Sequence, residues 1–327
     1  MKKFFGILVV LLGIFAGSSA QAEAMNVFEV TVNPPASQID PNVSYLNLEL
    51  APQAAETVTI SLKNASDQPL KIAPSFNRAV TNNLGVVEYS GKREETLDGI
   101  PVNIEDLVTF NEEIIQLTPQ EEKIVTSEIM MPQEAFSGVV AGGFYFEQVP
   151  EGEVQGGVRN IFSRETALLI RNENTAVEPE LKIVSAKPIQ ENGRNMIEVT
   201  IDNPQPAYIH KLKIEHLVEN GSEEFLKGEK ASMSVAPNSQ FKYILPLDGQ
   251  EFQAGEHTVH LTATSGSRIW TGKPTFTIEH QEASALNSQD VTIERQGFPW
   301  WMILIIGFIV VQAIIILVLV KRRKKVE

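Results

Sequence analysis

Hydrophobic and polar residues alternate along most of the chain between its two apolar ends. The alternation is clear in Phe28–Val32, Val58–Leu62, Ile197–Ile201 and Thr258–Ala263. A period of two residues places successive side chains on opposite faces of a β-strand, so each segment predicts a strand with one buried face. Turn-forming pairs such as Asn192-Gly193 separate the strands at spacings typical of antiparallel sandwiches. We therefore predict an all-β fold.

The alternating pattern occurs in two similar halves. Strand Val58–Leu62 leads into Lys63-Asn64, and the strand ending at Ile201 leads into Asp202-Asn203. Farther along, Leu117-Thr-Pro119 matches Val235-Ala-Pro237, and a glycine and another strand follow each. Repetition of one strand and turn template predicts two domains of related topology, which we expect to be tandem Ig-like β-sandwiches.

A second apolar feature is a continuous run near the C-terminus. Residues 300–320 are 21 positions without a charge, enough for a helix to cross a hydrocarbon core of about 30 Å. The run begins with aromatic residues and basic residues follow it, which predicts a transmembrane helix with a cytoplasmic tail; a buried core helix is the alternative. The expected anchoring residues are Trp300, Trp301, Lys321, Arg322, Arg323, Lys324 and Lys325.

The N-terminal apolar run is shorter and has a different character. Lys2 and Lys3 precede it, and small residues with an Ala-x-Ala pattern follow it near residue 22. This arrangement is typical of a secretory signal peptide. We therefore expect an extracellular ectodomain held at the cell membrane by one helix. The expected organisation is a signal peptide at 1–24, a first sandwich at 25–150, a linker at 151–157, a second sandwich at 158–282, a stalk at 283–299, a transmembrane helix at 300–320 and a basic tail at 321–327.

Composition narrows the class of protein. The chain has no cysteine, so the ectodomain has neither disulfides nor thiolate metal sites, and this favours an exported protein of a Gram-positive bacterium. It carries 41 Asp and Glu against 27 Lys and Arg, a formal net charge of −14. Seven of the basic residues lie at the two ends, which makes the segment between them more acidic still. We expect no nucleic acid as a ligand.

The two halves differ in the length of the segment between the asparagine turn and the following proline. Asn64 to Pro119 spans 55 positions, whereas Asn203 to Pro237 spans 34. The additional residues fall within 80–110. Long insertions on a rigid sandwich often bind partners, although an extra hairpin at a sandwich edge is an equal alternative. The candidate partner-binding residues are Glu88, Tyr89, Glu94, Glu95, Asp98 and Tyr145.

Three segments in each half carry a resemblance to a known family. They are Phe28–Val32, Asn82–Tyr89 and Gly138–Phe146 in the first half, and Ala167–Ile170, Val199–Pro204 and Gly255–Leu261 in the second. The first three resemble the peptidoglycan-binding module of the WxL-interacting proteins of Gram-positive bacteria, and the last three resemble the host-binding module of that family. The resemblance implies a cell-surface binding protein whose partners are secreted WxL proteins, peptidoglycan and, as a further partner, host matrix protein. It implies no catalytic residue.

The sequence offers little for catalysis, and we expect no enzyme activity and no cofactor. His257 and His260 lie three apart on one predicted strand, so they face opposite ways and do not chelate one ion together. Acidic pairs such as Glu112-Glu113 are adjacent and diverge in the same way, although a cation bound by the acidic first domain is left open. A cell-wall hydrolase and an envelope sensor are the alternative functions. The seven residues after 320 leave a sensor little cytoplasmic surface.

Overall fold

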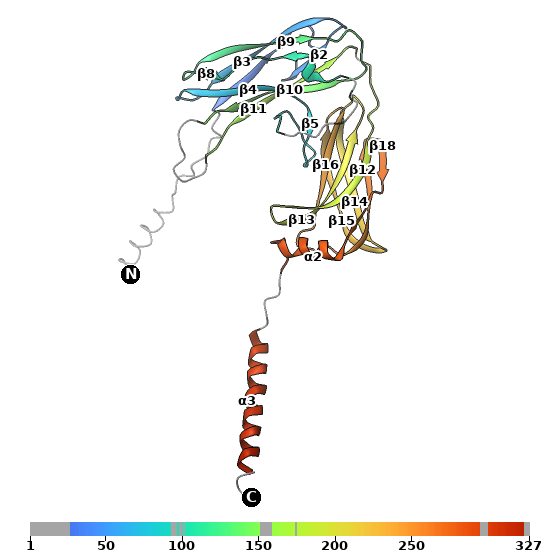
Figure 1. Ribbon diagram of the computed structural model, residues 1–327. Helices are drawn as coiled ribbons and strands as arrows, with labels where there is room; N and C mark the ends of the chain where they lie inside the picture. Colours follow the sequence, from blue (N-terminus) through green and yellow to red (C-terminus); the bar gives the residue numbers. More distant parts are fainter. Residues whose placement is uncertain are drawn as a thin grey trace, which may run out of the picture.

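The protein consists of two β-sandwiches that meet at an angle, followed by a separate C-terminal helix (Figure 1). The computed structural model describes residues 27–92, 97, 100, 102–150, 159–173, 175–294 and 300–323, with the side chains of the last helix described over 302–317. Strand β5 (Val80–Thr81) lies in the inner angle between the sandwiches. The expected signal peptide (1–24) and linker (151–157) lie outside the described residues.

The first sandwich pairs a four-stranded sheet with a five-stranded one. In the four-stranded sheet the order is β1 (Phe28–Asn33), β3 (Ala55–Asn64), β9 (Glu122–Met130) and β7 (Val108–Thr109). The five-stranded order is β2 (Leu46–Glu49), β11 (Ser163–Arg171), β10 (Val140–Gln148), β4 (Leu70–Arg78) and β8 (Ile115–Leu117). All pairs are antiparallel except β2 with β11.

Alternation along the strands builds the first core as the sequence predicts. Val58, Ile60 and Leu62 of β3 are fully buried, and the residues between them are not. Their apolar side chains meet Phe144 and Phe146 of β10 in one cluster. Because every second residue points inward, a single run of alternating sequence supplies one wall of the core.

Strand β11 (Ser163–Arg171) belongs to the first sandwich, although we expected the second to begin at residue 158. It pairs with β10 on one side and with β2 on the other, and its Leu168 and Ile170 enter the first core. The order of strands along the chain did not reveal this placement, because an apolar alternating strand can complete either of two neighbouring sheets.

The second sandwich has its own sheets and its own core. One sheet has the order β12 (Lys182–Glu191), β13 (Arg194–Asn203) and β16 (Ser239–Pro246). The other has the order β15 (Glu223–Val235), β14 (Ile209–Asn220), β17 (Gly255–Ser265) and β18 (Arg268–Gly272), and β19 (Thr275–Ile278) also pairs with β17. Apolar side chains from both sheets form one cluster separate from the first core.

The segment expected to be a stalk, 283–299, begins as part of the second sandwich. Helix α2 (His280–Gln289) buries Ala283 against the second core. The side chain of Asp290 then accepts a hydrogen bond from the backbone N–H of Asn195 at 2.8 Å. Burial and hydrogen bonding of this segment extend the folded part to at least Thr292, whose N–H donates to Asp290 at 2.7 Å.

A buried asparagine closes the same turn in each sandwich. Asn64 ends β3, and its Nδ2 donates to the carbonyl oxygens of Gln68 at 2.8 Å and Thr118 at 3.0 Å. Asn203 ends β13, and its Nδ2 donates to the carbonyl oxygens of Ala207 at 2.7 Å and Ala236 at 2.9 Å. Both asparagines are fully buried. These matching hydrogen bonds give the sequence repeat a structural basis.

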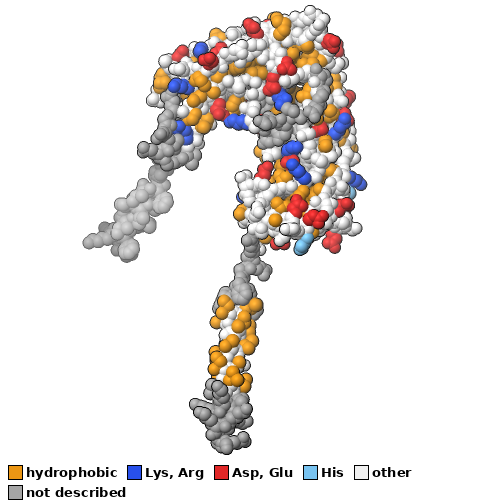
Figure 2. Space-filling view, viewed as in Figure 1, with side chains coloured by type: hydrophobic (Ala, Val, Ile, Leu, Met, Phe, Trp, Pro, Cys, Tyr) orange, Lys and Arg blue, Asp and Glu red, His pale blue; other side chains and the backbone are white. Residues whose placement is uncertain are grey.

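The last helix, α3 (Trp300–Arg323), stands apart from both sandwiches and presents a hydrophobic surface over its drawn side chains (Figure 2). Its described side chains from Met302 to Leu317 include many exposed large hydrophobics. Within the part of the chain that the structure describes, no helix meets the length and apolarity needed to cross a membrane.

Candidate functional site

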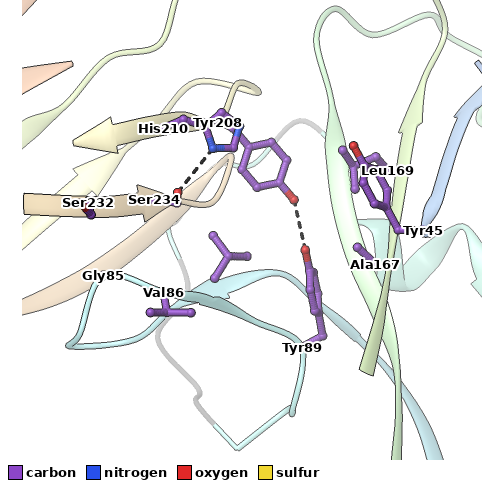
Figure 3. A pocket seen from close by; sticks show the side chains of 11 residues that line it. Tyr45, Gly85, Val86, Tyr89, Ala167, Leu169, Tyr208, His210, Ser232 and Ser234 are labelled. Atoms are coloured by element: carbon purple, nitrogen blue, oxygen red, sulfur yellow. Dashed lines mark hydrogen bonds between the residues drawn. The ribbon is translucent and has the colours of Figure 1, made fainter. Parts of the chain in front are cut away.

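A pocket of about 420 Å³ lies between the two sandwiches, beside the β5–β6 hairpin (Figure 3). Its walls come from Tyr45 next to β2, from the hairpin, from β11, and from strands β14 and β15 of the second sandwich. The lining residues are Tyr45, Gly85, Val86, Val87, Tyr89, Ala167, Leu169, Tyr208, His210, Ser232 and Ser234. Neither sandwich forms this pocket alone.

The hairpin of β5 and β6 (Val87–Glu88) reaches from the first sandwich to the second. Thr81 Oγ1 accepts a hydrogen bond from the backbone N–H of Ala236 at 2.9 Å, and both residues are buried. At the tip, the carbonyl oxygen of Gly85 accepts from Ser234 N–H at 2.8 Å. Both donors are backbone N–H groups of the second sandwich, so the hairpin is an interdomain contact.

Asn82 and Gly85 determine the shape of the hairpin tip. Asn82 Oδ1 accepts hydrogen bonds from the N–H groups of Leu84 at 3.0 Å and Val86 at 3.1 Å. Gly85 has a positive φ of 73°, and a Cβ there would lie 2.3 Å from Cγ of Met233. A side chain at 85 would therefore both strain the turn and push the tip off β15.

Within the expected insertion, 80–110, two parts play different structural roles. Strand β7 pairs with β9 and forms an edge of the first sandwich, which matches the edge-hairpin alternative in part. The β5–β6 hairpin instead contacts the second sandwich. The sequence comparison of the two halves did not anticipate this second role, because contacts between domains leave no periodic signal in either domain.

Tyr89 is the central residue at the junction of the two sandwiches. Its ring lies over β10, where a Cβ on Gly143 would be 2.5 Å from the Tyr89 Cγ. Its N–H donates to Glu165 Oε2 at 3.1 Å, and its hydroxyl lies 3.4 Å from that of Tyr208. Burial raises the pKa of Tyr89 above its ordinary value, although the Tyr208 hydroxyl partly offsets this.

The second sandwich supplies a ring pair to the pocket. Tyr208 and His210 stack with their ring centroids 5.3 Å apart and their planes 9° from parallel. His210 Nδ1 lies 3.4 Å from Ser234 Oγ (Figure 3). Burial raises the pKa of Tyr208 well above its ordinary value, so its hydroxyl stays protonated at neutral pH. The pocket thus combines aromatic faces with uncharged hydroxyl groups.

Carboxylates lie near the pocket without lining it. Glu165 accepts the Tyr89 N–H, and burial raises the pKa of its carboxyl group. Glu88 Oε2 accepts a hydrogen bond from Asn82 Nδ2 at 3.0 Å on the hairpin. Within the described part of the chain, neither Lys nor Arg lines the pocket. A cation does contact the hairpin: Lys230 of β15, whose Nζ donates to the carbonyl oxygen of Asn83 at 3.3 Å.

Tyr145, one of the candidate partner-binding residues, is buried at 9% exposure. Its neighbours Phe144 and Phe146 belong to the first core, and Tyr145 does not. Its hydroxyl donates to Glu147 Oε2 at 2.6 Å and accepts from Lys92 Nζ at 3.1 Å. The hydrogen bond from Lys92, followed by that from Tyr145, lowers the pKa of Glu147.

The structure brings only some of the candidate residues together. Tyr89 lines the pocket, Glu88 lies next to it on the hairpin, and Tyr145 lies in a separate cluster with Lys92. Glu94, Glu95 and Asp98 lie outside the described residues. The side chains of Trp300, Trp301, Lys321, Arg322 and Arg323, and all of Lys324 and Lys325, do so as well.

Sequence reasoning missed the residues from the second sandwich, Tyr208, His210, Ser232 and Ser234. They lie more than 100 positions from Tyr89, and only the angle between the sandwiches brings them near it. The available signal was the spacing of two within each pair, since Tyr208 and His210 flank the first residue of β14 and Ser232 and Ser234 lie on β15. Among the described residues no group of three or more His, Cys, Asp or Glu could hold a metal ion.

The opposite side of the junction is also a close contact. Val139 N–H donates to the carbonyl oxygen of Pro206 at 2.7 Å. Gly138 has a positive φ of 78°, and a Cβ there would lie 2.3 Å from the same oxygen. Glycine at 138 therefore lets the two backbone segments approach to hydrogen-bonding distance. A pocket of about 570 Å³ adjoins this contact, lined by residues that include Phe136 and Asn238.

Comparison with protein families gives two matches in tandem. The description "WxL Interacting Protein, peptidoglycan binding domain" matches residues 28–148. The description "WxL Interacting Protein, host binding domain" matches residues 153–288. Together they cover most of the chain, in the order that the sequence resemblance predicts. No curated protein matches the chain.

Several solved structures resemble the chain at low identity. The class 5 fimbriae chaperone CfaA is 14% identical, covers 75% of this chain and 99% of its own, and has a TM-score of 0.30. The E. coli chaperone DraB is 16% identical, covers 77% and 97%, and has a TM-score of 0.30. The PapD-like domain 7 of human CEP192 is 12% identical, covers 46% and 88%, and has a TM-score of 0.27. Values this low carry no argument about function.

Proposed function

We infer the function from family membership: the chain belongs to the WxL Interacting Protein family, and we propose that it is an anchored cell-surface binding scaffold. In this proposal the first module binds peptidoglycan, the second binds a host surface protein, and secreted WxL proteins are the third partner. The observation that carries it is the tandem match of two binding modules. Both matched descriptions are of binding domains, which favours a scaffold over a cell-wall hydrolase.

The hydrogen bonds across the junction support joint presentation of the two modules. The hairpin bonds at Thr81 and Gly85 and the Val139–Pro206 bond join the sandwiches at separate points. A junction held at several points limits hinge motion more than a single linker does. The scaffold would then hold its two ligands in a set relative position.

The proposed location is the outer face of the cell membrane, with the C-terminus inside. Support comes from the uncharged run 300–320, from the basic residues that follow it, and from the signal-like N-terminus. Protease added to wall-free cells should digest 25–299 and spare the tail; a protected ectodomain would contradict this orientation.

The proposed contact with a WxL protein involves the segment after the hairpin. Thr81 and the tip of the hairpin bind the second sandwich, which leaves Glu88 at the end of the hairpin, Tyr89 and the acidic residues Glu94, Glu95 and Asp98 as the candidates. An acidic surface would bind a basic partner less tightly as salt rises. Deleting 91–99 should abolish co-purification of the WxL protein and leave the circular dichroism spectrum unchanged. Capture at unchanged affinity would place the contact elsewhere.

Peptidoglycan binding is tested with the full chain in detergent. The protein is mixed with purified cell-wall sacculi and sedimented, and a membrane protein of similar charge serves as the control for nonspecific retention. We expect this chain in the pellet and the control in the supernatant. Recovery of both in the supernatant would contradict the assignment of the first module.

A further inference from the structure

We propose that the pocket between the sandwiches binds an uncharged sugar segment, one or two rings of a glycan chain. The proposal rests on the peptidoglycan-binding function proposed above and adds a location and a ligand chemistry. It further assigns part of the glycan contact to the second sandwich, because Tyr208, His210, Ser232 and Ser234 line the same pocket.

The aromatic content of the pocket suits a sugar. Tyr45, Tyr89 and Tyr208 line it together with His210, and these rings come from both sandwiches (Figure 3). One face of a pyranose is a surface of C–H groups that packs on an aromatic ring, while its hydroxyls remain free to bond elsewhere. The volume, about 420 Å³, falls in the range of roughly 300–1,000 Å³ found for small-molecule sites.

The polar groups of the pocket match sugar hydroxyls. Ser232 and Ser234 contribute hydroxyls that both donate and accept, and His210 contributes an imidazole. The two contacts drawn in Figure 3, Tyr89 to Tyr208 and His210 to Ser234, are both 3.4 Å long. Hydrogen bonds of this length are weak. A sugar hydroxyl placed between such groups would therefore break only weak hydrogen bonds and would form shorter ones in their place.

The charge around the pocket disfavours an anionic ligand. Among the described residues that line it there is neither Lys nor Arg, while Glu165 bonds to the backbone of Tyr89 and Glu88 lies on the hairpin. A phosphodiester polymer or a nucleotide would find no cationic side chain in this lining to balance its charge. An uncharged N-acetylated sugar, the kind that alternates along peptidoglycan, meets no such penalty.

A peptide strand is a poorer fit for the same pocket. Strand β11 is already paired on both sides, with β10 and β2. Strand β14 is paired on both sides as well, with β15 and β17. Strand β15 is the edge of its sheet, but beside the pocket its Ser234 N–H is already bonded to the Gly85 carbonyl oxygen. A peptide would therefore find few free backbone partners for strand addition in these walls.

The test measures binding of chitotetraose, the uncharged tetramer of N-acetylglucosamine, to the full chain by saturation-transfer NMR and calorimetry. A detergent without a sugar headgroup avoids competition for the site. His210→Ala and Ser234→Ala remove pocket groups, and His280→Ala is the matched control, because His280 is an exposed histidine at the start of α2. We expect each pocket variant to weaken binding by about three- to tenfold, the loss of one neutral hydrogen bond, and the control to leave binding unchanged.

Three results would overturn the proposal. The first is failure of the wild-type chain to bind chitotetraose at millimolar concentration, and the second is equal binding by all variants. The third is displacement of chitotetraose by a peptide that contains Trp and Leu, if the same pocket variants also weaken binding of that peptide. Thermal unfolding establishes that each variant is folded, and Ser232→Ala replaces any variant that is not. Sedimentation with sacculi separates this proposal from the proposed function. If the wild type sediments with sacculi but does not bind chitotetraose, the pocket proposal is wrong and peptidoglycan binding stands.

Discussion

The hydroxyls of Tyr89 and Tyr208 lie 3.4 Å apart although the two residues belong to different sandwiches. Tyr89 reaches this position because Gly143 beneath it has no side chain. Tyr208 reaches it because the Val139–Pro206 hydrogen bond brings the start of β14 close to the first sandwich. The junction is therefore built from small residues that permit close approach and from aromatic residues that fill the space left.

The contact between Gly143 and Tyr89 predicts a non-additive pair of substitutions. In Gly143→Ala the new methyl group would lie 2.5 Å from Tyr89 Cγ, and overpacking of this kind costs about 1–3 kcal/mol. Tyr89→Ala removes the clash, so the double variant should be less destabilised than the sum of the two single variants. Urea unfolding of the four proteins measures this. Strict additivity would mean that the ring does not lie over residue 143.

Docking of the hairpin depends on the Thr81 hydroxyl. Thr81→Val keeps the shape but leaves the buried Ala236 N–H without its acceptor at 2.9 Å, a loss of about 1–3 kcal/mol. Thr81→Ser is the control, since it keeps the hydroxyl. Distances between spin labels on the two sandwiches should broaden in the valine variant and stay narrow in the serine variant. Equal distributions would show that the hairpin does not hold the junction.

The two buried asparagines provide a matched test of the internal repeat. Asn64→Ala and Asn203→Ala each remove the buried amide's hydrogen bonds to two carbonyl oxygens, and each should cost about 1–3 kcal/mol. Because the residues lie in separate cores, the free energies should add in the double variant to within about 0.5 kcal/mol. Denaturant titration followed by circular dichroism gives these values. A large cost at one position only would argue against equivalent turns.

The second sandwich should lose stability in mild acid because of His257. The ring is fully buried, stacks on Phe276 and lies edge-on to Phe225. Burial lowers its pKa in the folded state, so the unfolded chain binds more protons, and stability falls as pH drops below the unfolded value of 6.5. Each unit of pKa difference is worth about 1.4 kcal/mol.

Unfolding measured at pH 7.5, 6.5 and 5.5 checks this dependence. His257→Leu should flatten the profile in part, because burial also lowers the pKa of His216 in the same sandwich. His280→Ala should leave the profile as it is in the wild type. An unchanged slope in the leucine variant would assign the acid sensitivity to other groups.

The sequence by itself determined the strands and the two cores. Alternation at Val58–Leu62 and Ile197–Ile201 identifies the buried faces, because successive side chains of a strand point to opposite faces of the sheet. The asparagine turns repeat at Asn64 and Asn203 because each sandwich closes the same corner with the same local bonds. The family resemblance also followed from local segments, and the tandem family matches confirm it.

Only the tertiary structure decided where the two sandwiches meet and what lies between them. Strand β11 joins the first sandwich across the expected boundary, helix α2 folds onto the second core, and the hairpin at Thr81 docks on Ala236. Tyr89 and Tyr208 share a pocket although 119 positions separate them. Local patterns report whether a side chain is buried, but not which distant surface buries it. Which surface buries a side chain depends on the shape complementarity and the hydrogen bonds between the folded domains.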